Sequence, residues 1–270
     1  MDAELEQLRH DSMAWIRQAG AMARERMETA VATRKADRSL VTDADQAVQD
    51  FLMGEIARRF PADAVISEET QADPDRHALA TAARRCWVID PIDGTRNYVR
   101  RVPMFTVSVA VMQEGSPVVA WIYNPMTDHM YSACRGGGAW LNDSRIEAAR
   151  QPPTGDVFLG LPSGREEPLP PVAHGWIDRM VFRATGSTAL NLALVASGSL
   201  DAAFAARCRL WDMAAGALIV EEAGAVVTDH SGRPYFPLDV SRYQGGSMPF
   251  LAAGPDLLRQ LLAELRGEVA

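Results

Sequence analysis

Two aspartates end an apolar run in the segment WVIDPIDGT, residues 87–95. Residues 87–89 suit a buried strand, and Asp90 and Asp93 follow it on either side of a Pro-Ile pair. Two carboxylates this close together both stay ionised only if a cation lies between them; otherwise one of them takes up a proton. The pair therefore predicts a cation-binding site at the end of a buried strand.

The residues around the two aspartates narrow down the cation. Pro91 fixes the backbone φ angle, and the turn can bring the carbonyl oxygen of Ile92 inward as a neutral ligand. Oxygen ligands with no His or Cys nearby favour Mg²⁺ or Mn²⁺ over zinc. Gly94 would let the backbone approach a ligand closely, and N–H groups at a helix start near Thr95 can hold a phosphate.

Acidic residues gather at three other places. Asp45 falls in the first turn of an expected helix, Glu68 and Glu69 end an expected strand, and Asp212 starts another expected helix. Each place also has a structural interpretation. Asp45 can cap its helix, the glutamate pair can lie in an exposed loop, and Asp212 can be an N-cap. The residues alone leave these alternatives open.

The composition and net charge of the chain limit the kinds of molecule that such a site could bind. The chain has 270 residues, 47% of them hydrophobic, and a formal net charge of −8. This is an ordinary globular composition, and an acidic surface repels nucleic acid and anionic membranes. An anionic substrate would need local positive charge, which a metal held by the carboxylates can supply. The combination predicts phosphoryl transfer to water, with a small phosphorylated metabolite as substrate.

Other features indicate the compartment. The three cysteines, Cys86, Cys134 and Cys208, are far apart and suggest neither a disulfide framework nor a zinc site. No apolar run approaches the roughly 18 to 20 residues that span a bilayer. The start of the chain is polar and acidic, unlike a signal peptide. We expect a cytoplasmic protein without membrane or nucleic-acid partners.

The first half of the chain predicts an α+β arrangement. Residues 3–30 favour a long helix, and residues 40–60 a second, amphipathic one that begins with a capping box of Thr42 and Asp45. Residues 64–69 and 86–90 suit short strands. Apolar alternation between 105 and 141, interrupted by turn residues, predicts an antiparallel meander. The glycines at 136–138 favour a hairpin turn over a phosphate loop, since no helix follows.

The second half alternates strands with helices, which predicts an α/β arrangement. We expect a loop over 162–175, and the expected strands and helices are as follows: strands 157–161, 181–185, 200–206, 225–229 and 250–254; helices 186–198, 211–224 and 255–267. We expect residues 1–143 to form an α+β half carrying most metal ligands. Residues 144–270 would form an α/β half carrying Asp212 and part of the substrate pocket, the two halves making one compact unit.

Four segments, LVTDADQ, ISEE, WVIDPIDGTRN and LWDMAAGALIVEEAG, resemble the signature blocks of the inositol monophosphatase family of Mg²⁺-dependent, lithium-sensitive phosphatases. The match runs in order from about residue 35 to residue 229. The resemblance implies a five-layered αβαβα sandwich shared with fructose-1,6-bisphosphatase. It also implies phosphomonoester hydrolysis by metal-activated water, and relatives that are commonly homodimers.

The resemblance implies a role for each matching residue. The metal ligands are Glu68, Asp90, the Ile92 carbonyl, Asp93 and Asp212, and they hold two Mg²⁺ ions that Mn²⁺ can replace. Asp90 bridges both ions. Glu69 stands behind the ligands and helps to hold a third, weaker ion. Asp45 and Thr95, with Glu68, form the catalytic group that activates the water. The substrate-binding residues are Asp93, Gly94, Thr95, Gly186, Ser187, Thr188 and Asp212.

The sequence departs from the inositol-specific pattern at one position. Those members carry a Glu seven residues before the Asp of the WD motif, where this chain has Ala205. Nearby Arg207 is either a surface residue or a ligand for a second anionic group. Fructose 1,6-bisphosphate, adenosine 3′,5′-bisphosphate and histidinol phosphate are alternative substrates in the family. Lys35 either faces the metal site or is a solvated loop lysine.

Two rival functions remain. Haloacid dehalogenase phosphatases use an aspartate nucleophile in D-x-D-x-T, but here the spacing is D-x-x-D-G-T, one residue longer. A regulatory binding module that kept the fold is the non-enzymatic alternative, since some bacterial relatives are thought to act with the transcription machinery.

Overall fold

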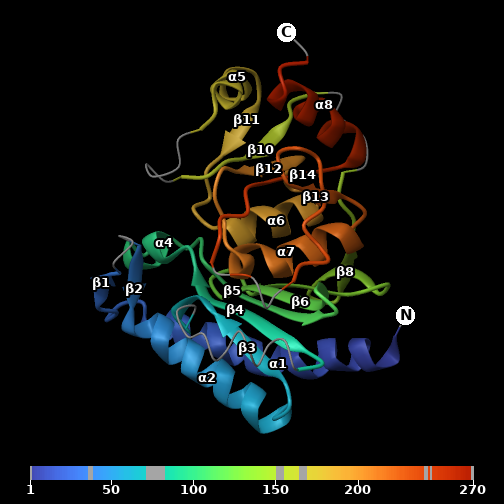
Figure 1. Ribbon diagram of the computed structural model, residues 1–270. Coiled ribbons are helices and arrows are strands. Elements are labelled where there is room, and N and C mark those ends of the chain that lie inside the picture. The colour runs from blue at the N-terminus through green and yellow to red at the C-terminus, as the bar shows by residue number, and fades with distance from the viewer. Residues whose placement is uncertain are drawn as a thin grey trace.

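The molecule consists of five layers, which alternate helices and sheets (Figure 1). A computed structural model describes residues 2–35, 39–70, 83–149, 155–163, 169–239, 243 and 245–268. The layers from the bottom of Figure 1 are the helix pair α1 and α2, a seven-stranded sheet, the pair α6 and α7, a five-stranded sheet, and the pair α5 and α8. The helices are α1 (Ala3–Arg26), α2 (Asp43–Arg59), α4 (Thr95–Val99), α5 (Pro171–Arg179), α6 (Thr188–Ala196), α7 (Leu210–Glu222) and α8 (Pro255–Leu265). The expected αβαβα sandwich is confirmed.

The larger sheet contains the predicted meander. Its strands lie side by side in sequence order: β3 (Ala64–Ser67), β4 (Cys86–Asp93), β5 (Thr106–Gln113), β6 (Ser116–Asn124), β7 (His129–Cys134), β8 (Gly138–Leu141) and β9 (Ser144–Ile146). All neighbours are antiparallel except β3 and β4, which run parallel. All eight residues of β4 are buried. Helices cover both faces of this sheet, so β4 carries a continuous apolar run rather than an alternating one.

Helices α6 and α7 form the layer between the two sheets. Ten residues of α7 are buried, because a helix covered on two sides must be apolar on most of its surface. The two helices approach closely at Gly216, where an added Cβ atom would lie 2.5 Å from the Leu192 side chain. The smaller sheet has the order β11 (Val181–Arg183), β10 (Phe158–Gly160), β12 (Ala202–Ala205), β14 (Phe250–Ala253) and β13 (Val226–Thr228). The start of α7 is bound to the larger sheet, where the Ser108 hydroxyl of β5 donates to the Trp211 carbonyl over 3.3 Å.

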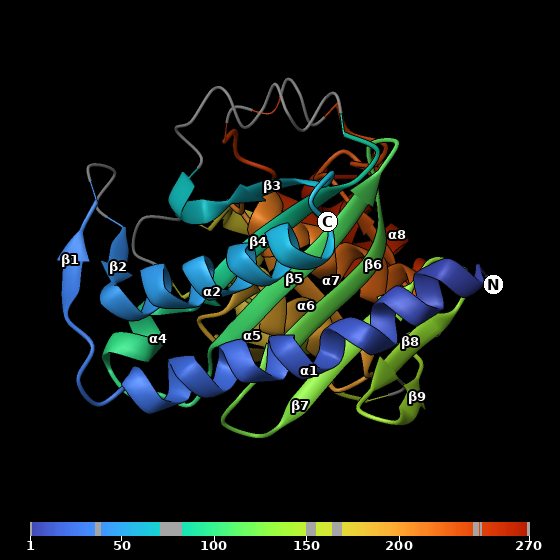
Figure 2. The same ribbon diagram turned by 90° about the horizontal axis from the view of Figure 1, so that it is seen from below.

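Three expectations about local structure need correction. Helix α1 ends at Arg26 rather than near residue 30. A hairpin of β1 (Ala32–Arg34) and β2 (Leu40–Thr42), which the sequence did not predict, follows it and lies beside α4 (Figure 2), so the second helix begins at Asp43 rather than at residue 40. Helix α5 begins inside the expected loop, because Pro171 suits the first turn of a helix and the Trp176 side chain is fully buried. Residues 164–168 of that loop lie outside the described residues.

Strand β9 belongs to the larger sheet although it begins at residue 144, so the sheet continues just past the expected division at 143. The division into two halves therefore stays a proposal. Among the described residues, the helices are too short or too polar to cross a bilayer.

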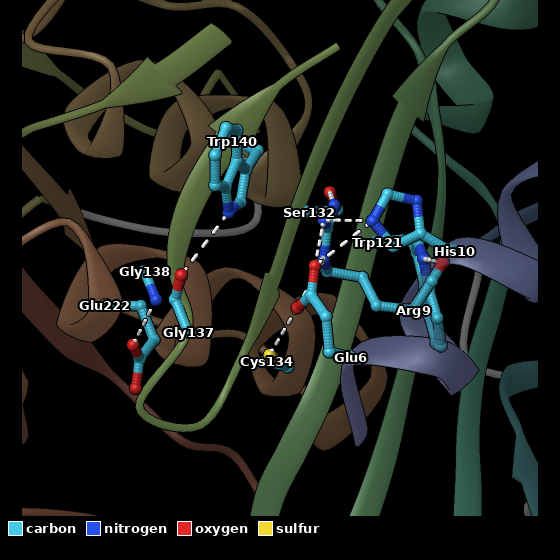
Figure 3. A network of polar contacts seen from close by, with 10 residues as sticks. All are labelled: Glu6, Arg9, His10, Trp121, Ser132, Cys134, Gly137, Gly138, Trp140 and Glu222. Carbon is cyan, nitrogen blue, oxygen red and sulfur yellow. Dashed lines mark hydrogen bonds and ion pairs between the residues drawn. The ribbon is translucent and has the colours of Figure 1, made fainter. Parts of the chain in front are cut away.

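Polar contacts join the larger sheet to α1 and to the end of α7 (Figure 3). Arg9 of α1 is buried, pairs with Glu6 and donates to Ser132 Oγ over 2.9 Å. At the β7–β8 turn, the N–H groups of Gly136 and Gly138 donate to the Glu222 carboxylate over 2.7 and 2.8 Å. β7 and β8 pair antiparallel on either side of this turn, which confirms the predicted hairpin, and the anion that its N–H groups hold is the Glu222 carboxylate.

Candidate active site

Asp90, Asp93 and Asp212 converge at one point between the layers. One carboxylate oxygen from each of the three lies within 4.8 Å of those from the other two. Asp90 and Asp93 come from the end of β4, where the pairing with β5 shifts register between them. Asp212 comes from the first turn of α7, more than a hundred residues further along the chain. The fold thus brings together carboxylates that the sequence separates.

Hydrogen bonds fix the directions of all three carboxylates, and that of Asp90 accepts from the Ile92 N–H over 3.1 Å. Asp93 accepts from the Ser187 hydroxyl and from the N–H groups of Thr188 (3.3 Å) and Ala189 (2.7 Å) at the start of α6. Asp212 accepts from the N–H of Arg209 over 2.7 Å. Arg209 is the N-cap of α7 and Asp212 stands three residues later, so the interpretation of Asp212 as the N-cap is wrong.

Asp45 caps its helix and still presents a carboxylate oxygen to the site. Its Oδ2 atom accepts from the N–H and hydroxyl of Thr42 over 2.8 and 2.5 Å, which confirms the predicted capping box. Its Oδ1 atom is buried without a hydrogen-bond partner among the described residues. A buried carboxylate oxygen left without a partner is costly, and a bound ion or an ordered water is the usual solution.

Glu68 and Glu69 lie in a short 3₁₀ helix, Glu68–Thr70, after β3. Lys35 Nζ lies 2.8 Å from Glu68 Oε1 and 2.6 Å from Glu69 Oε1. Burial opposes the charge of Lys35, but the two carboxylates outweigh it and raise the pKa of the lysine. Lys35 is therefore held at the acidic site, and its interpretation as a solvated loop lysine is wrong.

Burial of the carboxylates and the repulsion between them raise their pKa values. Burial, and then the charges of Glu68, Asp93, Asp212 and Asp45, raise the pKa of Asp90 well above its ordinary value. Burial also raises the pKa of Asp212 strongly, with Asp93 and Glu68 adding to the effect. Burial raises the pKa of Asp93 to about 6, although the Ser187 hydrogen bond opposes it, and that of Asp45 to about 7.

The turn after β4 connects the acids to a cleft. Thr95 Oγ1 donates to the Ile92 carbonyl over 3.1 Å. Gly94 has a φ of +95°, a conformation that favours glycine, and a Cβ atom there would lie 3.0 Å from the Met104 carbonyl oxygen. The cleft is lined by Ser39, Leu40, Glu68, Gly94, Thr95, Arg96, Leu161, Pro162, Ser163, Gly186, Ser187, Thr188 and Asn191. The residues of the GST segment that were predicted to contact the phosphate, Gly186, Ser187 and Thr188, thus all line the cleft.

Asn97 is a site residue that the sequence reasoning missed. Its side-chain amide donates to the carbonyls of Met104 (2.6 Å) and Thr185 (2.7 Å), which ties α4 to the segment before α6. The one feature of the sequence that could have indicated its role is that an amide side chain stands two residues after Thr95. Ala205 and Arg207 are not among the cleft residues in the described part of the chain; Ala205 is buried in β12 and Arg207 is exposed.

The donor set fits a hard divalent cation. Buried carboxylate oxygens, with no His or Cys among the three converging ligands, match the ligands of Mg²⁺ and Mn²⁺. The raised pKa values and the unpartnered Asp45 oxygen indicate the same deficit of positive charge.

Known proteins resemble this chain along almost its whole length. The model of the inositol monophosphatase family matches residues 4–267. The Nus factor SuhB of Escherichia coli is 33% identical over 263 residues, which cover 94% of each protein. The structure of an IMPase from Thermotoga maritima matches with a TM-score of 0.80 at 27% identity, covering 98% of this chain and 100% of the other. An inositol monophosphatase from Anabaena matches with a TM-score of 0.79 at 26% identity, covering 98% and 97%.

Proposed function

Since the chain belongs to the inositol monophosphatase family, we propose that it hydrolyses a small phosphomonoester with the help of Mg²⁺. Two or three Mg²⁺ ions bound among the carboxylates, or Mn²⁺ in their place, would neutralise phosphate oxygens and lower the pKa of a bound water. The residues that would hold them are Glu68, Asp90, the Ile92 carbonyl, Asp93 and Asp212, with Glu69 behind. The observation that carries the proposal is the convergence of two buried carboxylates from β4 and a half-buried one from α7 beside the cleft.

Residues of this chain then position the water and the phosphate. Asp45 is held by Thr42 through one carboxylate oxygen, so its other oxygen can accept a proton from the attacking water. Thr95, whose hydroxyl donates to the Ile92 carbonyl, lies beside the proposed ligands and can orient that water. Glu68 completes the catalytic group.

The phosphate and the alcohol would lie in the cleft. Gly94 and Thr95 line one side of it and residues 186–188 another, so backbone N–H groups and hydroxyls can donate to phosphate oxygens. We further propose that the enzyme is cytoplasmic, lithium-sensitive and homodimeric, as the family resemblance implies.

A substrate panel tests the proposal. Wild-type protein with Mg²⁺ should release phosphate from at least one small phosphomonoester, and Li⁺ or a chelator should suppress the release. Asp93→Asn should abolish the release, because an amide cannot supply the negative charge that the ions require. Trapping of a phospho-aspartate would instead favour the haloacid dehalogenase mechanism.

A regulatory binding module is the second candidate. The specific observation in its favour is the similarity to a protein named Nus factor SuhB. Phosphate release from no member of a broad phosphomonoester panel would favour this function over the first. Release by the wild type that Asp93→Asn removes would establish the enzyme and leave a binding role as an addition.

A further inference from the structure

The start of helix α7 is held by a segment near the end of the chain. The hydroxyl of Tyr243 accepts from the Leu210 N–H over 2.9 Å and donates to the Gly246 carbonyl over 3.0 Å. Just before the helix, the backbone of Cys208 accepts from the Met248 N–H over 2.9 Å, and its thiol donates to the carbonyl of the same methionine. These contacts, between residues 33 and 40 positions apart in the sequence, tie the segment to the point at which α7 begins.

The Tyr243 hydroxyl takes the place of a helix cap. The first N–H groups of a helix have no partner inside it, and a short polar side chain at the N-cap usually accepts from one of them. The N-cap of α7 is Arg209, whose guanidinium offers no acceptor. A phenolic hydroxyl has one hydrogen, which is directed at Gly246, and its oxygen is left to accept from the Leu210 N–H. Tyr243 thus supplies the acceptor that the N-cap residue lacks.

The capped turn carries a proposed metal ligand, Asp212. Trp211, directly before it, is buried, and its ring lies edge to face with that of Tyr243 at 6.1 Å between centroids. The Trp211 carbonyl accepts from the Ser108 hydroxyl over 3.3 Å, and Ser108 of β5 is the strand partner of Asp90. The first turn of α7 is therefore held both by Tyr243 and by the strand that pairs with the other metal ligands.

The position of this turn decides whether Asp212 can act together with the two aspartates of β4. One oxygen from each of the three carboxylates lies within 4.8 Å of the others. Mg²⁺ requires its ligand oxygens at about 2.0–2.1 Å and in near-ideal octahedral directions, so a small shift of the helix start removes a ligand from reach. Without the Tyr243 hydroxyl, the Leu210 N–H loses its acceptor and the first turn loses one of the contacts that fix it.

We propose that Tyr243 is a positioning residue of the metal site, which it serves by fixing the first turn of α7 and with it the carboxylate of Asp212. The inference rests on the proposed phosphatase function and adds to it a residue outside the family motifs. Tyr243 is not among the residues that line the described cleft, so its effect reaches the reaction through the metal ligand and not through the substrate.

The variant Y243F tests the assignment, because it removes only the hydroxyl group. Mn²⁺ binding to the metal-free protein is measured by calorimetry without substrate, and the Mg²⁺ dependence of phosphate release is measured on the best phosphomonoester. The Kd for Mn²⁺ should rise by ~5- to 10-fold, less than the roughly 10- to 100-fold typical of a residue that bonds a metal ligand directly. The Mg²⁺ concentration for half-maximal release should rise by a similar factor. At saturating Mg²⁺, kcat should stay within about threefold of wild type, because excess metal restores occupancy.

Y235F is the matched control. Tyr235 is half-buried and donates from its hydroxyl to the Pro249 carbonyl over 2.5 Å, a contact with the same part of the chain that does not involve α7. Both variants should lower Tm in chelator by about 2–4 °C, since each loses hydrogen bonding to the backbone, but Y235F should bind Mn²⁺ as wild type does. In a D212N background, Y243F should change the Kd for Mn²⁺ by less than about twofold, because residues that act through one another are not additive.

The outcomes separate this inference from the proposed function. A Y243F protein that binds Mn²⁺ as tightly as wild type, or a Y235F protein that weakens binding equally, would overturn the role of Tyr243 while the phosphatase function stands. An undiminished effect of Y243F in the D212N background would do the same. A wild type that binds Mn²⁺ but releases phosphate from no ester would remove the phosphatase function, and the role of Tyr243 at the metal site would still be decided by the binding data. A wild type that binds no Mn²⁺ would remove both.

Discussion

At the scale of one residue, the carboxyl group of Asp90 shows that the site lowers the stability of the fold. It is buried, and four other acids raise its pKa in the metal-free protein. A structural role does not require this arrangement, since a neutral side chain of the same shape would remove the repulsion. A site that destabilises its own fold is typical of groups kept for function.

Replacement of Asp90 by asparagine should therefore separate stability from activity. D90N should lose phosphate release by more than ~100-fold, the upper range for residues one layer behind a metal ligand. The metal-free variant should nevertheless unfold at a higher temperature than metal-free wild type at pH 8. Thermal unfolding in chelator and a phosphate-release assay measure the two effects. A variant that is both active and less stable would contradict the assignment of Asp90 as a metal ligand.

Ala205 leads to a prediction about the alcohol. Its methyl group cannot accept a hydrogen bond from a polyol, and the residue is buried in β12. We therefore expect kcat/KM on inositol 1-phosphate to be at least about tenfold below that on the best substrate, because a missing hydrogen bond to a carboxylate is worth about 1.5–3 kcal/mol. A panel in which inositol 1-phosphate is the preferred substrate would contradict this.

At the scale of elements, the site depends on the junction between α4 and the start of α6. Gly186 stands at this junction with a φ of +79°, and an added Cβ atom would lie 2.6 Å from the Asn97 amide nitrogen. Any side chain there must displace the amide that holds the two segments together. The positions of Thr95 and Ser187 in the cleft depend on the same contact.

Gly186→Ala should reduce both stability and activity. We expect a loss of roughly 2–3 kcal/mol in the free energy of unfolding and at least a tenfold fall in kcat/KM, from backbone strain and the displaced amide. Gly136→Ala is the matched control, since Gly136 has a similar φ of +74° with no atom within 4 Å of the added Cβ. The control should lose about 1 kcal/mol and keep full activity. Urea unfolding and initial rates compare the two, and equal activity would contradict the role of the junction.

The same elements show where sequence reasoning succeeds. Thr42 and Asp45 form the capping box that their spacing predicts, because both partners lie within one turn. The convergence of Asp90, Asp93 and Asp212 follows from recognisable motifs at strand and helix ends. These are local signals, or signals carried by a family pattern.

The sequence left the position of Lys35 open between the metal site and a solvated loop, and it gave no sign of the contacts of Asn97. Lys35 pairs with carboxylates 33 and 34 residues away, and Asn97 bonds a carbonyl 88 residues away; neither distance leaves a periodic trace. Helix α5 was missed because Pro170 and Pro171 stand at its start and Gly175 lies inside it, and only the packing of Trp176 shows that it forms. Tertiary contacts decide such cases over local propensity.

At the scale of the whole molecule, the ionisation of carboxyl groups makes the stability of the fold depend on pH. Asp45 and Asp93 have pKa values of about 7 and about 6, above the ordinary 3.8. The folded metal-free protein therefore binds more protons than the unfolded chain between pH 4 and 7. The stability contributed by these groups is fully present below pH 3.8 and is lost as the pH rises through 6 to 7. Glu6 and Asp229, whose pKa values are lowered to about 2, contribute throughout the range above pH 5.

The metal-free protein should thus become less stable as the pH rises from 5 to 8, by about 5 °C or more in Tm. Excess Mg²⁺ should raise Tm more at pH 8 than at pH 5, because protons and metal ions compete for the same carboxylates. His230, whose pKa burial lowers, acts in the opposite direction below pH 6.5. The control is therefore D90N, which keeps His230, and its Tm should change less with pH than that of the wild type. A metal-free wild type whose Tm rises steadily across this range would show that the buried acids do not repel one another as the geometry requires.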